Sequence, residues 1–258
     1  MPFAAGLHYF MSGADNLLRP PAVLVHGAAG QHLFWPPQIR RLHNQRVYAP
    51  DLPGHGKSSG LGRHTISDYA SVLLEFVQTL NLSTVVLVGH SMGGAIALEF
   101  AARFPSQVLG LVLVGSGARL RVSAELMRST SNLETFPEAI KLLMQLSFAP
   151  HTDARLKELA SRRLAEIRLH VLQGDLLACD AFDGSKRLAA ITVPTLIVCG
   201  AADKMTPPVH SVYLREHIAG ARLELVPDAG HMVMLEKPEL VAGRLSDFLD
   251  SIVYQPGR

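Results

Sequence analysis

Cysteine, aromatic residues and blocks of like charge are all scarce in this sequence, and each scarcity excludes a class of protein. The only two cysteines in 258 residues, Cys179 and Cys199, match neither a disulfide framework nor the spacing of metal ligands. We therefore expect a reducing compartment, the cytoplasm. The 24 basic and 22 acidic residues are mixed along the chain and leave a net charge of only +2, so no nucleic-acid partner is predicted.

Long hydrophobic runs are also missing. No apolar run approaches the length of a membrane-spanning helix, and residues 1–10 lack the charged start and apolar centre of a signal peptide, so we predict no membrane partner. The chain contains no internal repeat and no low-complexity segment. Its hydrophobic fraction of 48% suffices for a large core, and 258 residues suit a single α/β domain. The oligomeric state is left open.

Six short runs predict strands, and most of them are apolar on both faces, which is typical of parallel strands that are covered on both sides. They are residues 22–26, 46–49, 84–88, 108–114, 195–199 and 222–226. Helical patterns at 67–80, 91–104 and 235–252 lie between or after them. The alternation predicts an α/β fold with a mostly parallel central sheet flanked by helices.

The alternation stops between residues 119 and 187, where no run is typical of a strand. Amphipathic helices are predicted there instead, at 123–128, 137–148, 153–173 and 176–182. We interpret residues 119–187 as a helical lid, inserted in a core of residues 1–118 and 188–258. The two parts are expected to form one structural domain.

Residues 87–95 read LVGHSMGGA, with a glycine two positions before Ser91 and another two positions after it. A predicted strand ends here and a predicted helix begins, so Ser91 lies on a very tight turn. Such a turn holds the serine in strained backbone angles and exposes its hydroxyl, while Gly89 and Gly93 remove colliding side chains. The bare pattern also occurs in structural Gly–Ser turns, but the strand–turn–helix context favours a nucleophile.

A serine nucleophile needs a base and a carboxylate that orients the base. Asp203 follows the strand at 195–199, and His231 follows the strand at 222–226, so both are expected at the carboxyl edge of the sheet. Asp228 is a rival acid, but it is only three residues before His231 and is poorly placed to reach behind the imidazole. The order serine, acid, histidine predicts a catalytic triad of Ser91, Asp203 and His231.

The loop after the first predicted strand reads HGAAG at 26–30. Its small residues allow the chain to turn over Ser91. The backbone N–H groups of Ala28 and Met92 are therefore candidates for an oxyanion hole. Ala29 in the same loop is a possible pocket residue.

Other candidate pocket residues are methionines and lid aromatics. Met205 and Met232 neighbour the predicted acid and base, whereas Met127 and Phe136 belong to the predicted lid. An apolar pocket suggests a short or medium uncharged acyl group. For His26, His55, His90 and Trp35 we predict structural roles, and for the two cysteines a role as small apolar residues.

Five segments occur in an order that resembles the α/β-hydrolase superfamily. They are HGAAG at 26–30, DLPGHGKS at 51–58, GHSMGG at 89–94, GAADKMTPP at 200–208 and GHMVMLEKPE at 230–239. Within the superfamily the sequence is most similar to small-lidded bacterial carboxylesterases and enol-lactonases. The resemblance implies Ser91 as nucleophile, Asp203 as acid and His231 as base, with no metal or organic cofactor and a small ester or lactone as substrate.

Other reactions and roles remain open on this sequence. Carbon–carbon bond hydrolases of the superfamily usually have an aromatic residue directly after the histidine, where this chain has Met232. Haloalkane dehalogenases and epoxide hydrolases place aspartate where this chain has Ser91. A ligand receptor that keeps the triad is a remote alternative, and an interface-active lipase is disfavoured because no lid segment has a strongly apolar exposed face.

Overall fold

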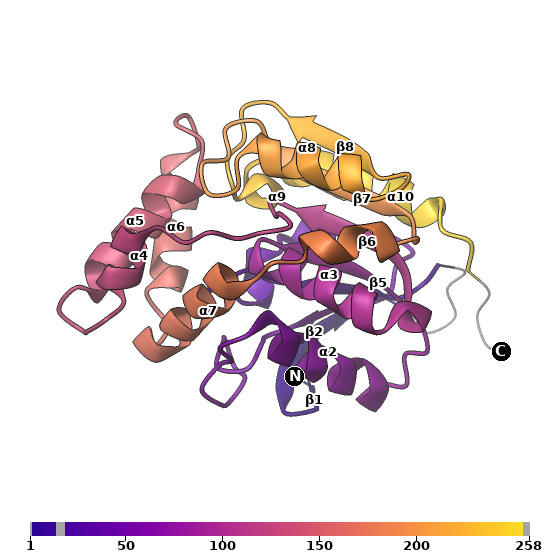
Figure 1. The fold of residues 1–258 in the computed structure, drawn as a ribbon, viewed down its shortest axis with the longest axis horizontal. Helices are drawn as coiled ribbons and strands as arrows, with labels where there is room; N and C mark the ends of the chain where they lie inside the picture. The colour runs from indigo at the N-terminus through magenta and orange to yellow at the C-terminus, as the bar shows by residue number, and fades with distance from the viewer. Residues whose placement is uncertain (1, 14–18, 255–258) are drawn as a thin grey trace.

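The computed structural model describes residues 2–13 and 19–254 (Figure 1). Its centre is one eight-stranded sheet with the order β1-β2-β4-β3-β5-β6-β7-β8. The strands are β1 (Phe3–Ala4), β2 (Leu7–Ser12), β3 (Ala22–Val25), β4 (Val47–Pro50), β5 (Val85–His90), β6 (Val108–Val114), β7 (Thr195–Gly200) and β8 (Arg222–Val226). From β4 to β8 along this order neighbouring strands are parallel, whereas β2 is antiparallel to both β1 and β4. The predicted α/β class is confirmed.

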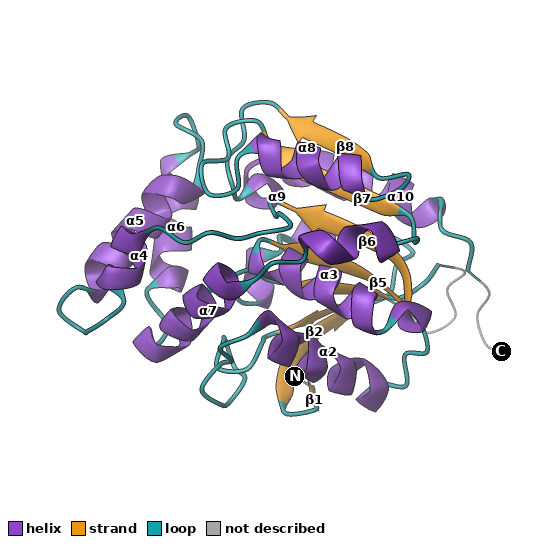
Figure 2. Cartoon of the chain, viewed as in Figure 1, coloured by secondary structure: helices purple, strands orange, loops and turns teal. Residues whose placement is uncertain are grey.

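Helices cover both faces of the sheet (Figure 2). On one face, Leu87 of β5 shares a core with residues of α2 (Ile66–Thr79), α3 (Met92–Arg103) and α8 (Pro208–His217). On the other, Val86 and Val88 share a core with residues of α1 (Pro37–Arg40) and α10 (Pro238–Asp250). Successive side chains of a strand point to opposite faces, so a strand between two helical layers must be apolar at every position. All six residues of β5 are buried accordingly.

Four helices between β6 and β7 lie together at the left of Figure 1, beyond the carboxyl ends of the strands. They are α4 (Ala124–Ser129), α5 (Phe136–Ser147), α6 (Ala154–Leu164) and α7 (Leu169–Ala181). Side-chain caps explain where two of them begin. The Ser123 side chain accepts a hydrogen bond from the Leu126 N–H, and the Asp153 carboxylate accepts from the Arg155 and Leu156 N–H groups.

Two predicted helices differ from those in the structure. The single helix expected at 153–173 is wrong, because α6 ends at Leu164 and α7 starts at Leu169 and continues through the segment predicted separately at 176–182. At the break, the Arg168 guanidinium donates to the carbonyls of Gly54 and Gly60 and turns the chain toward the sheet.

The predicted helix at 235–252 is also divided, into α9 (Val233–Glu236) and α10. Lys237 between them has φ −133° and ψ 58°, because the residue before a proline avoids helical angles. The sequence interpretation also missed β1 and β2. Their hairpin turns through Ala5 and Gly6, which both have positive φ, and its two strands form one edge of the sheet.

The turn from β5 into α3 is the tightest point of the fold. Ser91 has φ 53° and ψ −117°, angles that a residue with a side chain rarely adopts. A Cβ on Gly89 would lie 2.2 Å from the Gly93 carbonyl oxygen, and a Cβ on Gly93 would lie 2.1 Å from the Val25 carbonyl oxygen. Only glycine therefore allows the start of α3 to touch both β5 and the end of β3.

Replacing Gly93 by alanine should destabilise the protein because the new methyl group meets a backbone oxygen, which cannot move aside without shifting β3. We expect the free energy of unfolding in urea to fall by about 3 kcal/mol or more. Gly243→Ala is the matched control, because a Cβ there meets no atom within 4 Å and lies on the exposed side of α10. That control should gain about 0.5–1 kcal/mol. Equal effects of the two substitutions would contradict the packing argument.

Candidate active site

The three residues of the predicted triad lie at the carboxyl ends of three parallel strands of the sheet. Ser91 follows β5, Asp203 follows β7 and His231 follows β8. Ser91 and His231 line the same cavity. The fold thus brings together residues that are separated by up to 140 positions, at the edge of the sheet where open α/β proteins place their sites.

Asp203 and His231 form a buried, hydrogen-bonded pair. The Nδ1 atom of His231 lies 2.9 Å from Oδ2 of Asp203, and both residues are less than 5% exposed. Thr206 supports the carboxylate by donating from its N–H to Oδ1 and from its hydroxyl to Oδ2. The rival acid Asp228 lies in an exposed turn with φ 53°. Asp203 is therefore the carboxylate that orients the imidazole.

Hydrogen bonding keeps the Asp203 carboxylate ionised. Burial alone would raise its pKa, but the His231 ring and the hydrogen bonds from Thr206 outweigh burial and lower the pKa below its usual value. An ionised carboxylate at Nδ1 holds a proton on that nitrogen and leaves Nε2 of His231 able to accept one.

Two further histidines beside the site are held neutral. His26 accepts a hydrogen bond at Nε2 from the Leu52 N–H, and its Nδ1 donates to the Gly27 carbonyl. His90 donates from Nε2 to the His231 carbonyl, and the two rings lie 4.7 Å apart. Burial is the main cause that lowers the pKa of His26 to about 4 and that of His90 to about 3. Both therefore shape the site as neutral rings, in line with the structural roles predicted for them.

These neutral histidines make the protein sensitive to acid. In the unfolded chain their pKa returns to about 6.5, so between pH 6 and 4.5 the unfolded chain binds more protons than the folded one. We expect the free energy of unfolding to fall as the pH drops through this range, by up to about 1.4 kcal/mol per pH unit for each histidine.

The pH dependence is measured by urea unfolding of the wild type and of His90→Gln. The variant should show a shallower slope because it lacks one of the two groups. His55 has a raised pKa, so it is protonated in both the folded and the unfolded chain below pH 6.5. Its contribution to the free energy of unfolding is therefore constant in this range and does not change the slope. An identical slope in both proteins would contradict the assignment.

The loop at 26–30 lies directly against Ser91. A Cβ on Gly27 would lie 3.0 Å from the Cβ of Ser91, and Ala28 lines the same cavity. Within the described part of the chain, no hydrogen bond engages the Ala28 N–H. The Met92 N–H belongs to the first turn of α3, where backbone N–H groups have no partner within the helix. Both candidate oxyanion donors are thus next to Ser91.

A buried carboxylate that the sequence analysis missed anchors this loop. Asp175 of α7 is fully buried and accepts hydrogen bonds from the Ala29 N–H at 3.0 Å and from the Tyr69 hydroxyl at 2.5 Å. It also pairs with His55 Nε2 at 2.8 Å, while His55 Nδ1 lies 3.0 Å from the Pro53 carbonyl. Both ring nitrogens face acceptors, which fits a protonated ring.

The charge of Asp175 explains the state of His55. Burial tends to lower the pKa of this histidine, but the adjacent Asp175 carboxylate outweighs burial and raises the pKa. The resulting ion pair joins α7, α2 and the loop at 26–30. No short motif marks Asp175 in the sequence, because its three partners come from distant segments.

Asp175→Asn should destabilise the protein strongly, because it leaves the buried His55 without its counter-charge. We expect a loss of about 3 kcal/mol in urea unfolding. Asp247→Asn is the matched control, since that carboxylate is 76% exposed on α10 and should change stability by less than about 0.5 kcal/mol. Tyr69→Phe, which removes one hydrogen bond and leaves the ion pair, should cost about 1 kcal/mol. If Asp175→Asn left the free energy of unfolding unchanged, the stabilising role of the His55–Asp175 pair would be refuted.

The cavity beside Ser91 has a volume of about 190 Å³ and mostly apolar walls. Met205 and Met232 line it, as the sequence analysis expected of them. Leucines from all four lid helices also line it, and the sequence analysis singled out none of them. These are Leu126 of α4, Leu143 and Leu146 of α5, Leu164 of α6 and Leu176 of α7. Nothing in the sequence distinguishes such leucines from those that pack the lid itself.

Three other predicted pocket residues lie elsewhere. Ala29 is buried with its N–H on Asp175 and faces a different surface hollow. Met127 and Phe136 pack against the hydrophobic core beneath the lid. Of the two cysteines, Cys179 lines the cavity and Cys199 lies inside β7, and both are free thiols. Trp35 is fully buried, in line with a packing role.

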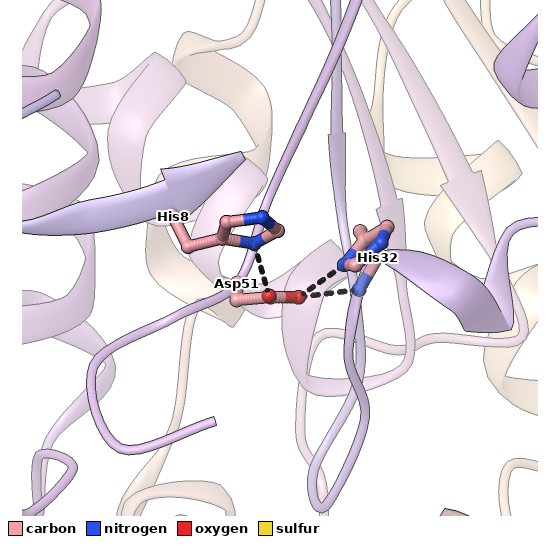
Figure 3. Close-up of side chains that lie close together, drawn as sticks. All are labelled: His8, His32 and Asp51. Carbon is pink, nitrogen blue, oxygen red and sulfur yellow. Dashed lines mark hydrogen bonds and ion pairs between the residues drawn. The ribbon is translucent and has the colours of Figure 1, made fainter. Parts of the chain in front are cut away.

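One group in the described residues has the composition of a metal site. His8, His32 and Asp51 are buried, and Figure 3 shows the carboxylate between the two imidazole rings. Each Nδ1 lies within 2.8 Å of a carboxylate oxygen, and the His32 and Lys57 N–H groups donate to the same carboxylate. The oxygens are therefore occupied by hydrogen-bond donors. This arrangement is that of a hydrogen-bonded carboxylate which ties β2 to the loops after β3 and β4.

The charge state of Asp51 agrees with this interpretation. Burial would raise its pKa, but the hydrogen bonds and charge of His32 lower it well below the usual range. An ionised, fully hydrogen-bonded carboxylate needs no metal ion to compensate its burial.

No helix in residues 2–13 and 19–254 is both long and apolar enough to cross a membrane. The family model described as the alpha/beta hydrolase fold matches residues 20–238. Over 249 residues the chain is 27% identical to 3-oxoadipate enol-lactonase 1 of Acinetobacter baylyi, covering 94% of this chain and 92% of that protein.

Two further similarities concern an esterase and a solved structure. Over 244 residues the chain is 30% identical to the pimeloyl-[acyl-carrier protein] methyl ester esterase of Neisseria meningitidis, covering 89% of this chain and 93% of that protein. The crystal structure of the enol-lactonase from Burkholderia xenovorans LB400 superposes with a TM-score of 0.90 at 25% identity, covering 97% of this chain and all of that one.

Proposed function

The chain belongs to the α/β-hydrolase family, and we propose that it is a serine hydrolase that cleaves carboxylic esters or lactones through an acyl-enzyme on Ser91. One observation carries the proposal: the Asp203–His231 pair lies on the same cavity as Ser91, which stands on a strained turn at the end of a central strand. Relatives named as an enol-lactonase and a methyl ester esterase support this class of reaction.

In the proposed mechanism, Nε2 of His231 takes the proton of the Ser91 hydroxyl as Oγ attacks the carbonyl carbon. The N–H groups of Ala28 and Met92 stabilise the negative oxygen that forms. His231 then gives its proton to the leaving oxygen, which yields the acyl-enzyme. Water, deprotonated by the same ring, hydrolyses this intermediate and restores Ser91. Asp203 holds the ring in the required tautomer throughout, and the mechanism uses no metal or organic cofactor.

We also propose that residues 119–187 act as the lid of this site. The support is that all four of their helices contribute a leucine to the cavity walls. Residues 1–118 and 188–258 then form the catalytic core. Two free, buried thiols are compatible with the cytoplasmic location we propose.

Hydrolysis of p-nitrophenyl esters from acetyl to palmitoyl tests the function. The wild type should prefer short acyl chains because the cavity is only about 190 Å³. Ser91→Ala should lower kcat at least about 1,000-fold while its unfolding curve stays close to that of the wild type.

Ser131→Ala, on the exposed part of the lid, is the control and should keep full activity. If wild type and Ser91→Ala are equally inactive on every ester, the proposed function is wrong, and carbon–carbon substrates become the next to assay.

A further inference from the structure

The cavity beside Ser91 has an unexpected electrostatic character. Two fully charged side chains, Arg121 and Lys204, line it, and no aspartate or glutamate of the described residues does. The sequence analysis suggested an uncharged acyl group because it expected an apolar pocket. The two cations, which come from loops that border the site, favour a different substrate.

Neither cation is neutralised by the protein. Within the described part of the chain, Arg121 and Lys204 have no ion pair and no hydrogen bond. The contrast with Arg119 is informative, because that arginine, only two residues earlier, pairs with Asp183 at 2.8 Å. Arg119 is thus paired with a carboxylate, whereas Arg121 is available to bind a ligand in the cavity.

Two other polar side chains of the walls already donate their hydroxyl hydrogens within the protein. The Ser147 hydroxyl donates to the Leu143 carbonyl, and the Thr206 hydroxyl donates to Asp203. The Ser123 hydroxyl accepts from the Leu126 N–H. Arg121 and Lys204 are the arginine and the lysine among the lining residues, so they are the groups suited to bind an anion.

The two cations come from segments that follow neighbouring strands. Arg121 is in the segment that follows β6 and Lys204 in the loop that follows β7. Both line the same cavity of about 190 Å³ as Ser91. In a cavity of that size, a short acyl chain can connect a reacting carbonyl at Ser91 with an anionic group at the cations.

From these observations we propose that Arg121 and Lys204 form an anion subsite, and that the substrate is a short ester or lactone whose acyl part ends in a carboxylate. This inference rests on the proposed function, because it specifies the substrate of the same site. The guanidinium and the ammonium group bind the carboxylate, while the leucine walls hold the intervening methylene groups. The product of such a reaction is a short dicarboxylate.

A matched pair of esters tests the subsite. Monomethyl adipate and methyl hexanoate have the same chain and the same reacting ester, and they differ only at the far end, which is a carboxylate in one and a methyl group in the other. The wild type should show a kcat/KM for monomethyl adipate at least about 10-fold above that for methyl hexanoate. Raising the ionic strength should shrink this ratio because Arg121 and Lys204 are exposed and salt screens their charges.

Substitution should remove the preference. Arg121→Gln and Lys204→Gln should each lower the ratio of the two kcat/KM values about 5-fold or more, mainly through KM for the half-ester. Arg155→Gln is the control, an exposed lid arginine that does not line the cavity, and it should leave the ratio unchanged. Equal hydrolysis of both esters by the wild type, or equal losses on both esters in the variants, would overturn the subsite.

A binding measurement separates this inference from the proposed function. Calorimetry with Ser91→Ala protein reports the affinity for each intact ester without turnover. Tighter binding of monomethyl adipate that depends on Arg121 and Lys204 supports the subsite even if the wild type hydrolyses neither ester, an outcome that would refute only the proposed function. Equal or undetectable binding of both esters, together with equal rates, refutes the subsite and leaves serine hydrolysis standing.

Discussion

The close approach of three backbone segments at Ser91 is the constraint on which the site depends. The start of α3 touches the end of β3 and the end of β5, with no room for a Cβ at Gly89 or Gly93. This contact holds Ser91 at φ 53°, and it also brings the loop at 26–30 against the Ser91 side chain. The strain at one residue is maintained by the packing of fully buried strands around it, which is how folded proteins hold a reactive group in an unfavourable conformation.

Buried carboxylates organise the loops around that point. Asp51, Asp175 and Asp203 are each almost inaccessible to solvent, and each accepts several hydrogen bonds that include one from a histidine. An unpaired charge in such surroundings would be very costly, so every one of these aspartates fixes the position of its partners. Asp203 orients His231, while Asp175 connects the lid helix α7 with the loop that carries Ala28. In contrast, Arg121 and Lys204 beside the cavity have no ion pair within residues 2–13 and 19–254.

Much of the architecture followed from local patterns. Parallel strands were predicted because most of the apolar runs are apolar on both faces, and Ser91, Asp203 and His231 were placed at strand ends because each directly follows such a run. The helix at 153–173 was mispredicted because the amphipathic pattern runs across the break before Arg168, whose contacts with Gly54 and Gly60 are not visible in the sequence. Of the predicted pocket residues, Met205 and Met232 were placed correctly since they adjoin the acid and the base, whereas Met127 and Phe136 depended on lid packing.

The sequence by itself determined the α/β class, the sharp turn at Ser91 and the positions of Asp203 and His231 in the loops after two strands. Hydrophobic periodicity and glycine spacing involve residues that are close in the sequence, so they can be recognised without the structure. Only the tertiary structure decided which leucines face the cavity, that Asp175 reaches Ala29 across 146 positions, and that Arg121 and Lys204 border one site without counter-charges. Those features depend on how helices of the lid pack on the sheet, and long-range packing leaves no local pattern in a single sequence.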